Sequence, residues 1–337
     1  MHRWDAEELA SWSWSGVRES RDDAPLIGDR PMYNGGEHLV GELRGPLVDA
    51  DPFAEAVASW AAETPEGTWL EARVRASVAR RWTRWYSLGV WAETTATAAR
   101  HSVPGQRDED GEVATDVLRL AARAQSFQAE LLLFSMRADV LPRVRAFSVV
   151  TSTPGAGRPY RADRAAWGTV LEVPRRSQMV YPDGGEAWCS PTCVAMALAH
   201  YGIDVAVPDA AADTYDWAYG GSGNWSFNVA YAARFGLDAH VARFGSLFEV
   251  ERAILGGVPI VTSYAWERGE LDGAPVDRSD GHLGVVIGFD ERGDPVVNDP
   301  AAPRDDEVRR TYPRWQFERQ WLLRSGGAAY VIRRPGV

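Results

Sequence analysis

Lysine is absent from this chain of 337 residues, so all 36 Lys and Arg positions are arginine. They are outnumbered by 47 Asp and Glu, which gives a formal net charge of -11 at pH 7. A net negative charge disfavours binding to nucleic-acid phosphates or to anionic lipid, and the arginine-rich stretches at 80–86 and 309–310 are short. We therefore expect neither nucleic acid nor a membrane as a partner.

Long apolar runs are missing too. No stretch approaches the roughly 18 apolar residues that a membrane-spanning helix needs, and residues 1–9 lack the charged-then-apolar pattern of an export signal. These absences predict a soluble protein in the cytoplasm. Secretion is the alternative if the true start of the chain lies elsewhere.

Cysteine is scarce: the chain has 2, too few for a disulfide scaffold. The composition, 45% hydrophobic and 25% charged, excludes collagen, a coiled coil and intrinsic disorder, and the length suffices for two domains. Tryptophan, by contrast, is abundant, with 15 residues. Most of these rings are expected in the core and in hairpins, although tryptophan also provides flat surfaces for ligands.

The N-terminal part, residues 1–150, shows the residue pattern of strands. Apolar and polar residues alternate over 70–78 and, less cleanly, over 127–133, and residues 144–150 are interpreted as one more strand. Several short strands separated by turns indicate a β-sandwich of the jelly-roll kind. Its tryptophans make a carbohydrate or a protein a possible ligand of this domain.

Residues 151–164 are rich in small residues, Gly and Pro, and are interpreted as a linker. The pattern then changes to helices followed by strands, which predicts an α+β domain over 165–337. The expected helices are 191–201 and 247–255, and the expected strands are 259–264, 282–289, 295–299 and 328–333.

The two cysteines differ in their surroundings. Cys189 precedes Ser-Pro-Thr at the start of the first expected helix of this domain, where proline is favoured and where Ser and Thr suit the cap. Unpaired backbone N–H groups and the positive end of the helix dipole favour thiolate over thiol there. Cys193 lies one turn further on among apolar residues. We expect Cys189 to be reactive and Cys193 to be structural.

Zinc binding is the competing interpretation. Cys189, Cys193 and His200 share one helical face and could serve as three ligands. No fourth ligand is evident nearby, and His200 also suits the last helical turn, where it can satisfy helix carbonyls. No metal or other cofactor is therefore expected.

A thiolate nucleophile needs a histidine partner, and the histidine needs an orienting group. Among the 6 histidines, His282 opens an apolar strand that turns near Asp290 and returns to Asp299. A tight antiparallel hairpin places His282 opposite Asp299, on a shared face, which suits a Cys–His–Asp relay. Asn298 would point to the other face unless a bulge shifts the register. Gln178, shortly before Cys189, is a candidate for the oxyanion hole together with the Cys189 N–H.

These residues resemble a known family. Residues 173–335 look like papain-like cysteine peptidases related to those that cut double-glycine leader peptides, that is, cysteine peptidase family thirty-nine and its stand-alone relatives. The resemblance rests on residues 177–179, 188–196, 280–289 and 297–300, in that order.

The resemblance implies a papain-like fold and a peptide or protein substrate. It implies Cys189 as nucleophile, His282 as base, Asp299 as orienting group and Gln178 in the oxyanion hole. The gap of eleven residues between Gln178 and Cys189 is longer than is usual, and residues 1–150 lie outside the resemblance. We expect a cysteine peptidase that forms a thioester. The same triad could instead run acyl transfer or deamidation, and a binding protein with an inactive peptidase-like domain is the remaining alternative.

Overall fold

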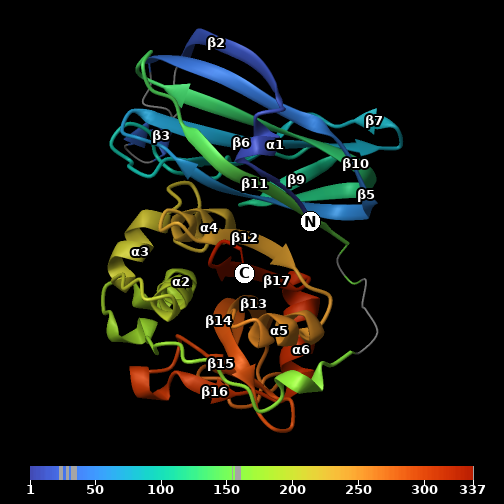
Figure 1. The fold of residues 1–337 in the computed structure, drawn as a ribbon, viewed down its shortest axis with the longest axis vertical. Helices are drawn as coiled ribbons and strands as arrows, with labels where there is room; N and C mark the ends of the chain where they lie inside the picture. Colours follow the sequence, from blue (N-terminus) through green and yellow to red (C-terminus); the bar gives the residue numbers. More distant parts are fainter. Residues whose placement is uncertain (23–25, 28–29, 32–35, 154, 156–160, 337) are drawn as a thin grey trace. The chain divides into compact units, whose positions relative to one another are not determined.

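The computed structural model describes residues 1–22, 26–27, 30–31, 36–153, 155 and 161–336. Its contacts divide the chain into two compact units (Figure 1). The N-terminal unit comprises Met1–Thr153 and Tyr215–Arg234, and the C-terminal unit comprises Pro154–Thr214 and Phe235–Val337. The sequence predicted two uninterrupted domains and contained no sign that residues 215–234 would join the first. Much of the expected linker, residues 154 and 156–160, lies outside the described residues.

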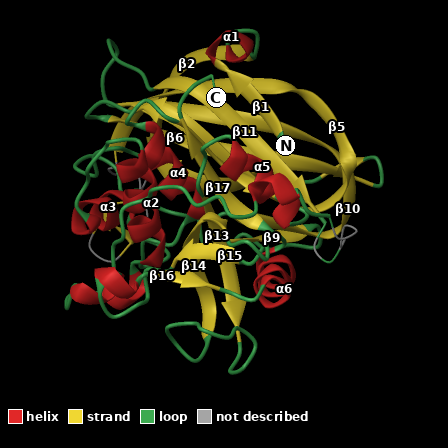
Figure 2. Cartoon of the chain, turned by 60° about the horizontal axis from the view of Figure 1, so that its bottom comes forward, coloured by secondary structure: helices red, strands yellow, loops and turns green. Residues whose placement is uncertain are grey.

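The N-terminal unit is built mainly from strands, drawn yellow in Figure 2. Its elements are β1 (His2–Asp5), α1 (Ala6–Leu9), β2 (Ser13–Asp22), β3 (Leu26–Ile27), β4 (Arg30–Pro31), β5 (Gly36–Glu63), β6 (Thr68–Val78), β7 (Arg81–Trp82), β8 (Tyr86–Trp91), β9 (Gly111–Ala114), β10 (Val117–Ser135), β11 (Arg143–Ser152) and α4 (Trp225–Ala233). The three strands predicted from the alternation of residues are confirmed as parts of β6, β10 and β11.

The predicted β-sandwich is not confirmed. Apart from the β3–β4 pair, the described strands of this unit form one nine-stranded sheet in the order β1-β11-β5-β10-β6-β7, with β2 on β5, β8 on β6 and β9 on β10. The long strands β5 and β10 pair through several register shifts. Such irregularities bend a strand and increase its twist. A buried cluster of this unit includes Val40, Trp69 and Phe134, which lie on β5, β6 and β10.

Tryptophan is mostly a core residue here, as expected. Trp60, Trp69 and Trp91 are at most 1% exposed, and the Trp69 ring stacks on Phe134 at a centroid distance of 5.2 Å. Large aromatic side chains bury much apolar area each and stabilise the sheet accordingly. An exception is Trp82, which is 36% exposed.

The buried carboxylate of Asp116 accepts hydrogen bonds at the start of α4. The backbone N–H groups of Trp225 and Ser226 donate to Asp116 Oδ2 at 2.5 and 3.2 Å, and the Asn224 side chain caps the same helix by accepting from the Phe227 N–H. Burial raises the pKa of Asp116 to about 6, although the two helix amides lower it.

Asp116→Asn is expected to stabilise the protein at neutral pH. The pKa of Asp116 is higher in the folded protein than its ordinary 3.8, so the free energy of unfolding falls as pH rises through the range between these values. Asparagine keeps an oxygen acceptor for the helix amides and removes the buried charge. Denaturant unfolding at pH 7.5 should show a gain of up to about 3 kcal/mol, and a flatter pH dependence between about pH 4 and 6. The exposed Asp139→Asn is the control. Equal pH slopes in the wild type and Asp116→Asn would contradict this expectation.

The C-terminal unit has helices packed on a six-stranded antiparallel sheet in the order β12-β17-β13-β14-β15-β16. Its helices are α2 (Cys189–His200), α3 (Val207–Thr214), α5 (Leu247–Leu255) and α6 (Arg314–Ser325), and its strands are β12 (Asp238–Arg243), β13 (Ile260–Trp266), β14 (Ser279–Phe289), β15 (Pro295–Asn298), β16 (Arg309–Thr311) and β17 (Ala328–Arg333). Four short 3-10 segments are Arg164–Ala166, Gln178–Val180, Gly185–Ala187 and Asp305–Glu307. Every helix and strand expected in this part of the chain is confirmed to within a few residues.

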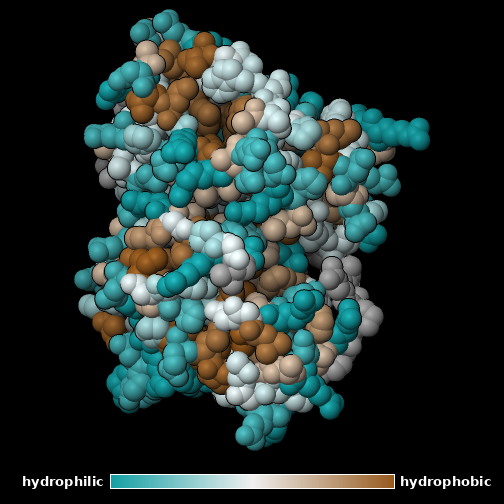
Figure 3. Space-filling model, viewed as in Figure 1, coloured by the Kyte–Doolittle hydropathy of each residue, from teal (hydrophilic) through white to brown (hydrophobic). Residues whose placement is uncertain are grey.

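Apolar spacing explains the packing of this unit. In α5, Leu247, Val250 and Ile254 follow helical spacing and are buried in a cluster that includes Tyr264 of β13 and Trp321 of α6. Within the described part of the chain, no helix is long and apolar enough to cross a membrane. On the face drawn in Figure 3, the hydrophobic areas (brown) are separated from one another by hydrophilic areas (teal).

Candidate active site

Cys189 begins helix α2, as the sequence predicted, but the cap differs from the expectation. Trp188 is the N-cap residue, and within the described residues no side chain caps this helix. The Ser190 hydroxyl instead bonds the Tyr330 hydroxyl at 2.8 Å. The N–H groups of the first turn therefore stay uncapped by side chains around the Cys189 sulfur.

The two thiols differ in access. Cys189 is partly exposed, whereas Cys193 is 0% exposed. Burial raises the pKa of Cys193 well above its ordinary value, and the neighbouring Cys189 and Asp299 raise it further. Cys193 therefore stays a neutral, apolar core residue, and Cys189 is the thiol that a reagent or substrate can reach.

His282 and Asp299 are brought together, although not in the predicted register. Strand β14 pairs with β15 as Val285↔Asn298 and Val286↔Val297, two residues out of step with the expected hairpin, and the register shifts again after Val286. Diagonal neighbours two residues apart still share a face of the sheet. The His282 Nε2 to Asp299 Oδ1 distance is 2.8 Å, and both side chains are buried.

Asp299 is surrounded by donors. Its Oδ1 accepts from His282 Nε2 and, at 3.0 Å, from the Ala301 N–H. Its Oδ2 accepts from the hydroxyls of Tyr264 and Tyr312 at 2.8 and 2.7 Å. The sequence interpretation missed both tyrosines. The signal for Tyr264 was its position directly opposite His282 in the β13–β14 pairing, which a register for residues 260–266 would have revealed.

In the buried His282–Asp299 pair, each charge stabilises the other. Burial alone raises the pKa of Asp299, but the charge of His282 and hydrogen bonds from His282, Tyr312 and Ala301 outweigh burial and lower it. Burial likewise lowers the pKa of His282, but the Asp299 charge and hydrogen bond, with a contribution from Cys189, outweigh it and raise the pKa to about 10. An imidazolium beside a carboxylate is therefore the stable state at neutral pH.

His282 also reaches the cysteine. An interaction with Cys189 is one of the causes that raise the pKa of His282, and because Nε2 bonds Asp299, Nδ1 is the ring nitrogen left for the sulfur. The rings of Tyr264 and Trp266 pack edge-on against the imidazole at centroid distances of 5.4 and 5.5 Å. These contacts restrict rotation of the His282 ring.

Gln178 lies on a segment that is hydrogen-bonded to the loop after Asp299. The Gln178 N–H donates to the Pro300 carbonyl at 2.9 Å, and the Ser177 hydroxyl donates to the Ala302 carbonyl at 2.5 Å. These bonds explain how Gln178 and Asp299, which are 121 positions apart in sequence, reach the same region. The side chain is buried at 2% exposure.

The amide of Gln178 is held by the loop that precedes Cys189. Its Nε2 donates to the carbonyls of Gly185 and Glu186 at 2.9 and 2.8 Å, and its buried Oε1 has no hydrogen-bond partner among the described residues. A Cβ at Gly185 would lie 2.2 Å from the Gln178 carbonyl oxygen, so only glycine allows this approach. The long gap between Gln178 and Cys189 thus folds back onto Gln178.

The zinc interpretation gains nothing from the structure. The His200 ring nitrogens approach the carbonyls of Glu172 and Gly257 at 2.8 and 3.1 Å, both outside α2. Among the residues that the structure describes, no group of three or more His, Cys, Asp or Glu is placed to hold a metal ion.

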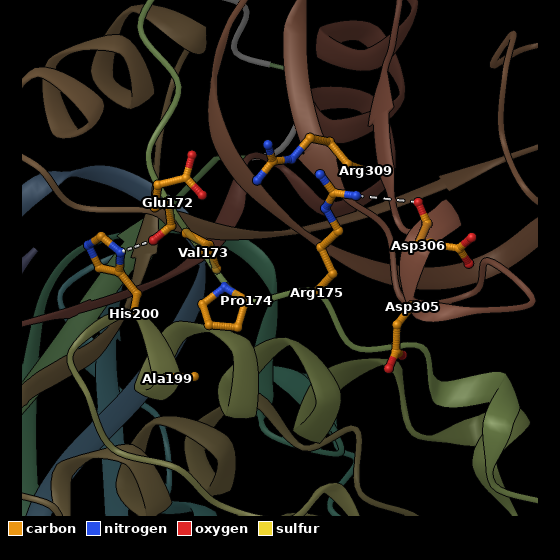
Figure 4. A pocket seen from close by; sticks show the side chains of 9 residues that line it. All are labelled: Glu172, Val173, Pro174, Arg175, Ala199, His200, Asp305, Asp306 and Arg309. Atoms are coloured by element: carbon orange, nitrogen blue, oxygen red, sulfur yellow. Dashed lines mark hydrogen bonds between the residues drawn. The ribbon is translucent and has the colours of Figure 1, made fainter.

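His200 instead lines a surface pocket (Figure 4). The pocket is lined by Glu172, Val173, Pro174, Arg175, Ala199, His200, Asp305, Asp306 and Arg309. It lies at the C-terminal end of α2, whereas Cys189 begins that helix, so it is separate from the Cys189–His282–Asp299 group.

The chain matches two models of one peptidase family. Residues 2–152 match the peptidase C39 N-terminal domain, and residues 170–329 match the peptidase C39-like family. No curated protein matches the chain.

Two solved structures are similar to part of the chain. A C39-like peptidase from Bacillus anthracis shares 19% identity over 49% of this chain and 98% of its own, with a TM-score of 0.37. A double-glycine-motif protease from an AMS/PCAT transporter, solved with its leader peptide, shares 20% identity over 49% of this chain and 94% of its own, with a TM-score of 0.34. The assignment rests on the two family models, which together leave only the linker and the chain ends unmatched. The chain is therefore a cysteine peptidase, with residues 170–329 similar to the peptidase C39-like family and residues 2–152 similar to the peptidase C39 N-terminal domain.

Proposed function

We propose that this peptidase cleaves peptide bonds with Cys189 as nucleophile, His282 as general acid and base, and Asp299 as the orienting group. The observation that carries the proposal is the 2.8 Å hydrogen bond between the buried His282 and Asp299 side chains, together with the contribution of Cys189 to the raised pKa of His282. A nucleophile, a base and an orienter in hydrogen-bond contact are what acyl transfer through a thiol requires.

The first half of the reaction forms a thioester. The Cys189 thiolate attacks the substrate carbonyl carbon, and the carbonyl electron pair moves onto oxygen. The resulting oxyanion is stabilised by the Cys189 N–H and by the Gln178 amide. When the carbon–nitrogen bond breaks, the His282 imidazolium gives its proton to the leaving amine.

The second half restores the enzyme. Neutral His282 takes a proton from water as the water oxygen attacks the thioester carbon, and the carbon–sulfur bond then breaks. The products are the free carboxylic acid, the thiolate and the imidazolium. If an amine takes the place of water, the same steps give acyl transfer, and product analysis separates the two outcomes.

Gln178 needs a local rearrangement for its role. Both neighbours of Nε2 in the resting site are carbonyls, of Gly185 and Glu186. Nε2 carries two hydrogens, so one stays with the loop and the other turns to the oxyanion when substrate binds. The loop between Gln178 and Cys189 therefore tunes the oxyanion hole.

Thiol alkylation tests the proposal. At pH 6, where an ordinary thiol with a pKa near 8.5 is almost fully protonated, iodoacetamide should modify one cysteine at least about ten-fold faster than a free thiol. Cys189→Ser should abolish this reaction because Cys189 is the exposed thiol, and Cys193→Ser should leave it unchanged because Cys193 is buried. His282→Ala should slow it. If neither thiol reacts faster than free cysteine, the proposed thiolate–imidazolium pair does not exist.

A further inference from the structure

Residues 215–234 belong to the peptidase by sequence and to the N-terminal unit by contact. They lie inside the range that matches the C39-like family, between Cys189 and His282, yet they cluster with Met1–Thr153. We propose that the N-terminal domain is a clamp for this segment, so that its main ligand is a part of the same chain.

The apolar side of the clamp is a socket for Phe227. This ring is 0% exposed and packs against Trp60 and Trp91 at centroid distances of 6.2 and 5.5 Å. The socket depends on Gly89, which has a φ of +143°, because a Cβ there would stand 3.0 Å from the Phe227 ring. A glycine in the middle of a strand such as β8 usually weakens it. Gly89 is explained here because it leaves room for the Phe227 ring.

The polar side of the clamp is centred on Asp216, which is completely buried. Its Oδ1 accepts from the N–H groups of Ser102, Ala218 and Tyr219 at 2.9, 3.0 and 3.0 Å. Its Oδ2 accepts from the Asn224 side chain at 2.9 Å. One carboxylate thus folds the turn that begins the segment and fixes that turn to Ser102, which lies in residues 1–153.

Further bonds continue along α4 to its end. The Ser226 hydroxyl donates to the Ala58 carbonyl at 2.7 Å, and Asp116 accepts from the first amides of the helix. At the other end, the Arg145 guanidinium donates to the Ala233 carbonyl at 2.8 Å. The start of the segment and both ends of its helix are therefore held. The buried groups at the start, Asp216 and Asp116, make bonds that would be costly to break.

The pattern distinguishes a permanent clamp from a site for a passing ligand. The segment is covalently continuous with α3, which ends at Thr214, and with β12, which begins at Asp238. A domain that grips residues 215–234 therefore constrains two elements of the peptidase unit at once. A peptidase without this domain would have to expose the Phe227 ring and the Asp216 carboxylate to water.

Cutting the linker tests the clamp in the full chain. A recognition sequence for a specific protease is inserted between Thr153 and Arg161, and the purified protein is cut. We expect the two fragments to elute together in size-exclusion chromatography at low micromolar concentration and to separate only in denaturant. The cut complex should keep its peptidase rate within about two-fold. Separation of the fragments in native buffer would overturn the proposal.

Variants identify the contact. Phe227→Ala combined with Ser226→Ala should release the N-terminal fragment after cutting and lower the peptidase rate more than ten-fold, whereas Phe235→Ala, a phenylalanine just outside the segment, should do neither. If the double variant does not fold, the isosteric Asp216→Asn, which places an amide among four donors, should raise the fraction of released fragment. Fragments that stay together in both variants would also count against the clamp.

The elution result does not depend on the chemistry proposed for Cys189. If the uncut protein shows no fast thiol but the fragments co-elute, the proposed triad fails and the clamp stands. If the thiol is fast in the uncut protein and the fragments separate, the clamp fails and the triad stands.

Discussion

His282→Ala should lower the peptidase rate by about 10³-fold or more, because general acid–base catalysis by a single side chain contributes roughly 10²–10⁴-fold and the same ring also stabilises the thiolate. The variant loses the group that protonates the leaving amine and later deprotonates water. The thiol of Cys189 remains, so weak reactivity toward alkylating agents should persist at high pH. Rates measured with a peptide substrate check the loss of activity, and alkylation rates over a range of pH check the residual reactivity of the thiol.

The pH profile separates a catalytic histidine from a structural one. The leaving amine needs the imidazolium, which is present below the pKa of His282 and is lost above it. Because that pKa is raised to about 10, activity should persist well above the ordinary histidine pKa of about 6.5 and fall only near pH 10. An alkaline limb near pH 7 would show that the His282–Asp299 pair is not ionised in the working enzyme.

The chain supplies a matched control for this variant. His240 of β12 is also buried and also faces a carboxylate, with Nδ1 3.5 Å from Asp238 Oδ1. Removing it deletes a buried imidazole of equal size outside the Cys189 site. His240→Ala should therefore reduce stability without changing the pH profile. A loss of rate equal to that of His282→Ala would indicate that both act through the fold.

The sequence allowed prediction of the parts of the site that depend on local pattern. The Ser-Pro-Thr that follows Cys189 marks a helix start, and the apolar run after His282 marks a strand. The contact between His282 and Asp299 was predicted through a register that was wrong by two residues, and it survived because alternate residues share a face. The Gly185 turn that holds Gln178 left no periodic signal.

The features that escaped prediction depend on contacts far apart in sequence. Tyr312 follows Asp299 by 13 positions and reaches it through the β15–β16 pairing. Residues 215–234 look like an ordinary helix with a turn, and nothing in their spacing shows that Trp60 and Trp91 receive Phe227. Local alternation shows which strands exist and not how they pair, so it did not reveal that they form one nine-stranded sheet, and the sandwich prediction is not confirmed.

Asp299→Asn should lower the peptidase rate by at least about 10²-fold, since loss of the carboxylate in a comparable triad places the histidine in the wrong tautomer. The surroundings of Asp299 make the amide a poor substitute. Both oxygens of the carboxylate accept from two donors each. An amide NH₂ at the Oδ1 position would face the hydrogens of His282 Nε2 and the Ala301 N–H, and at the Oδ2 position it would force both tyrosine hydroxyls to turn and accept. In either orientation the charge that fixes the His282 ring is lost. The measurement is the peptidase rate against pH.

Tyrosine variants show whether the hydroxyls act through Asp299. Tyr264→Phe and Tyr312→Phe keep the rings, and with them the contacts of Tyr264 with Trp266 and Phe317. Burial and the nearby Asp299 charge raise the pKa of both tyrosines well above the ordinary value, so they remain neutral donors. Each variant removes one hydrogen bond to a buried charge, worth about 1.5–3 kcal/mol. We expect about a ten-fold loss of rate for each.

Tyr264→Phe, compared in the wild type and in the Asp299→Asn variant, shows whether the Tyr264 hydroxyl acts through Asp299 or whether Tyr264 contributes only packing. With Asp299 present, Tyr264→Phe removes one of the hydrogen bonds that hold the carboxylate against His282. In the Asp299→Asn background, the hydroxyl no longer meets an acceptor charge, so its removal should cost little further rate. A coupling of this kind requires that the hydroxyl and the carboxylate act as one unit. An equal ten-fold loss in both backgrounds would instead assign Tyr264 a role in packing alone, and His282 would then owe its charge to Asp299 and Cys189 without help from the phenols.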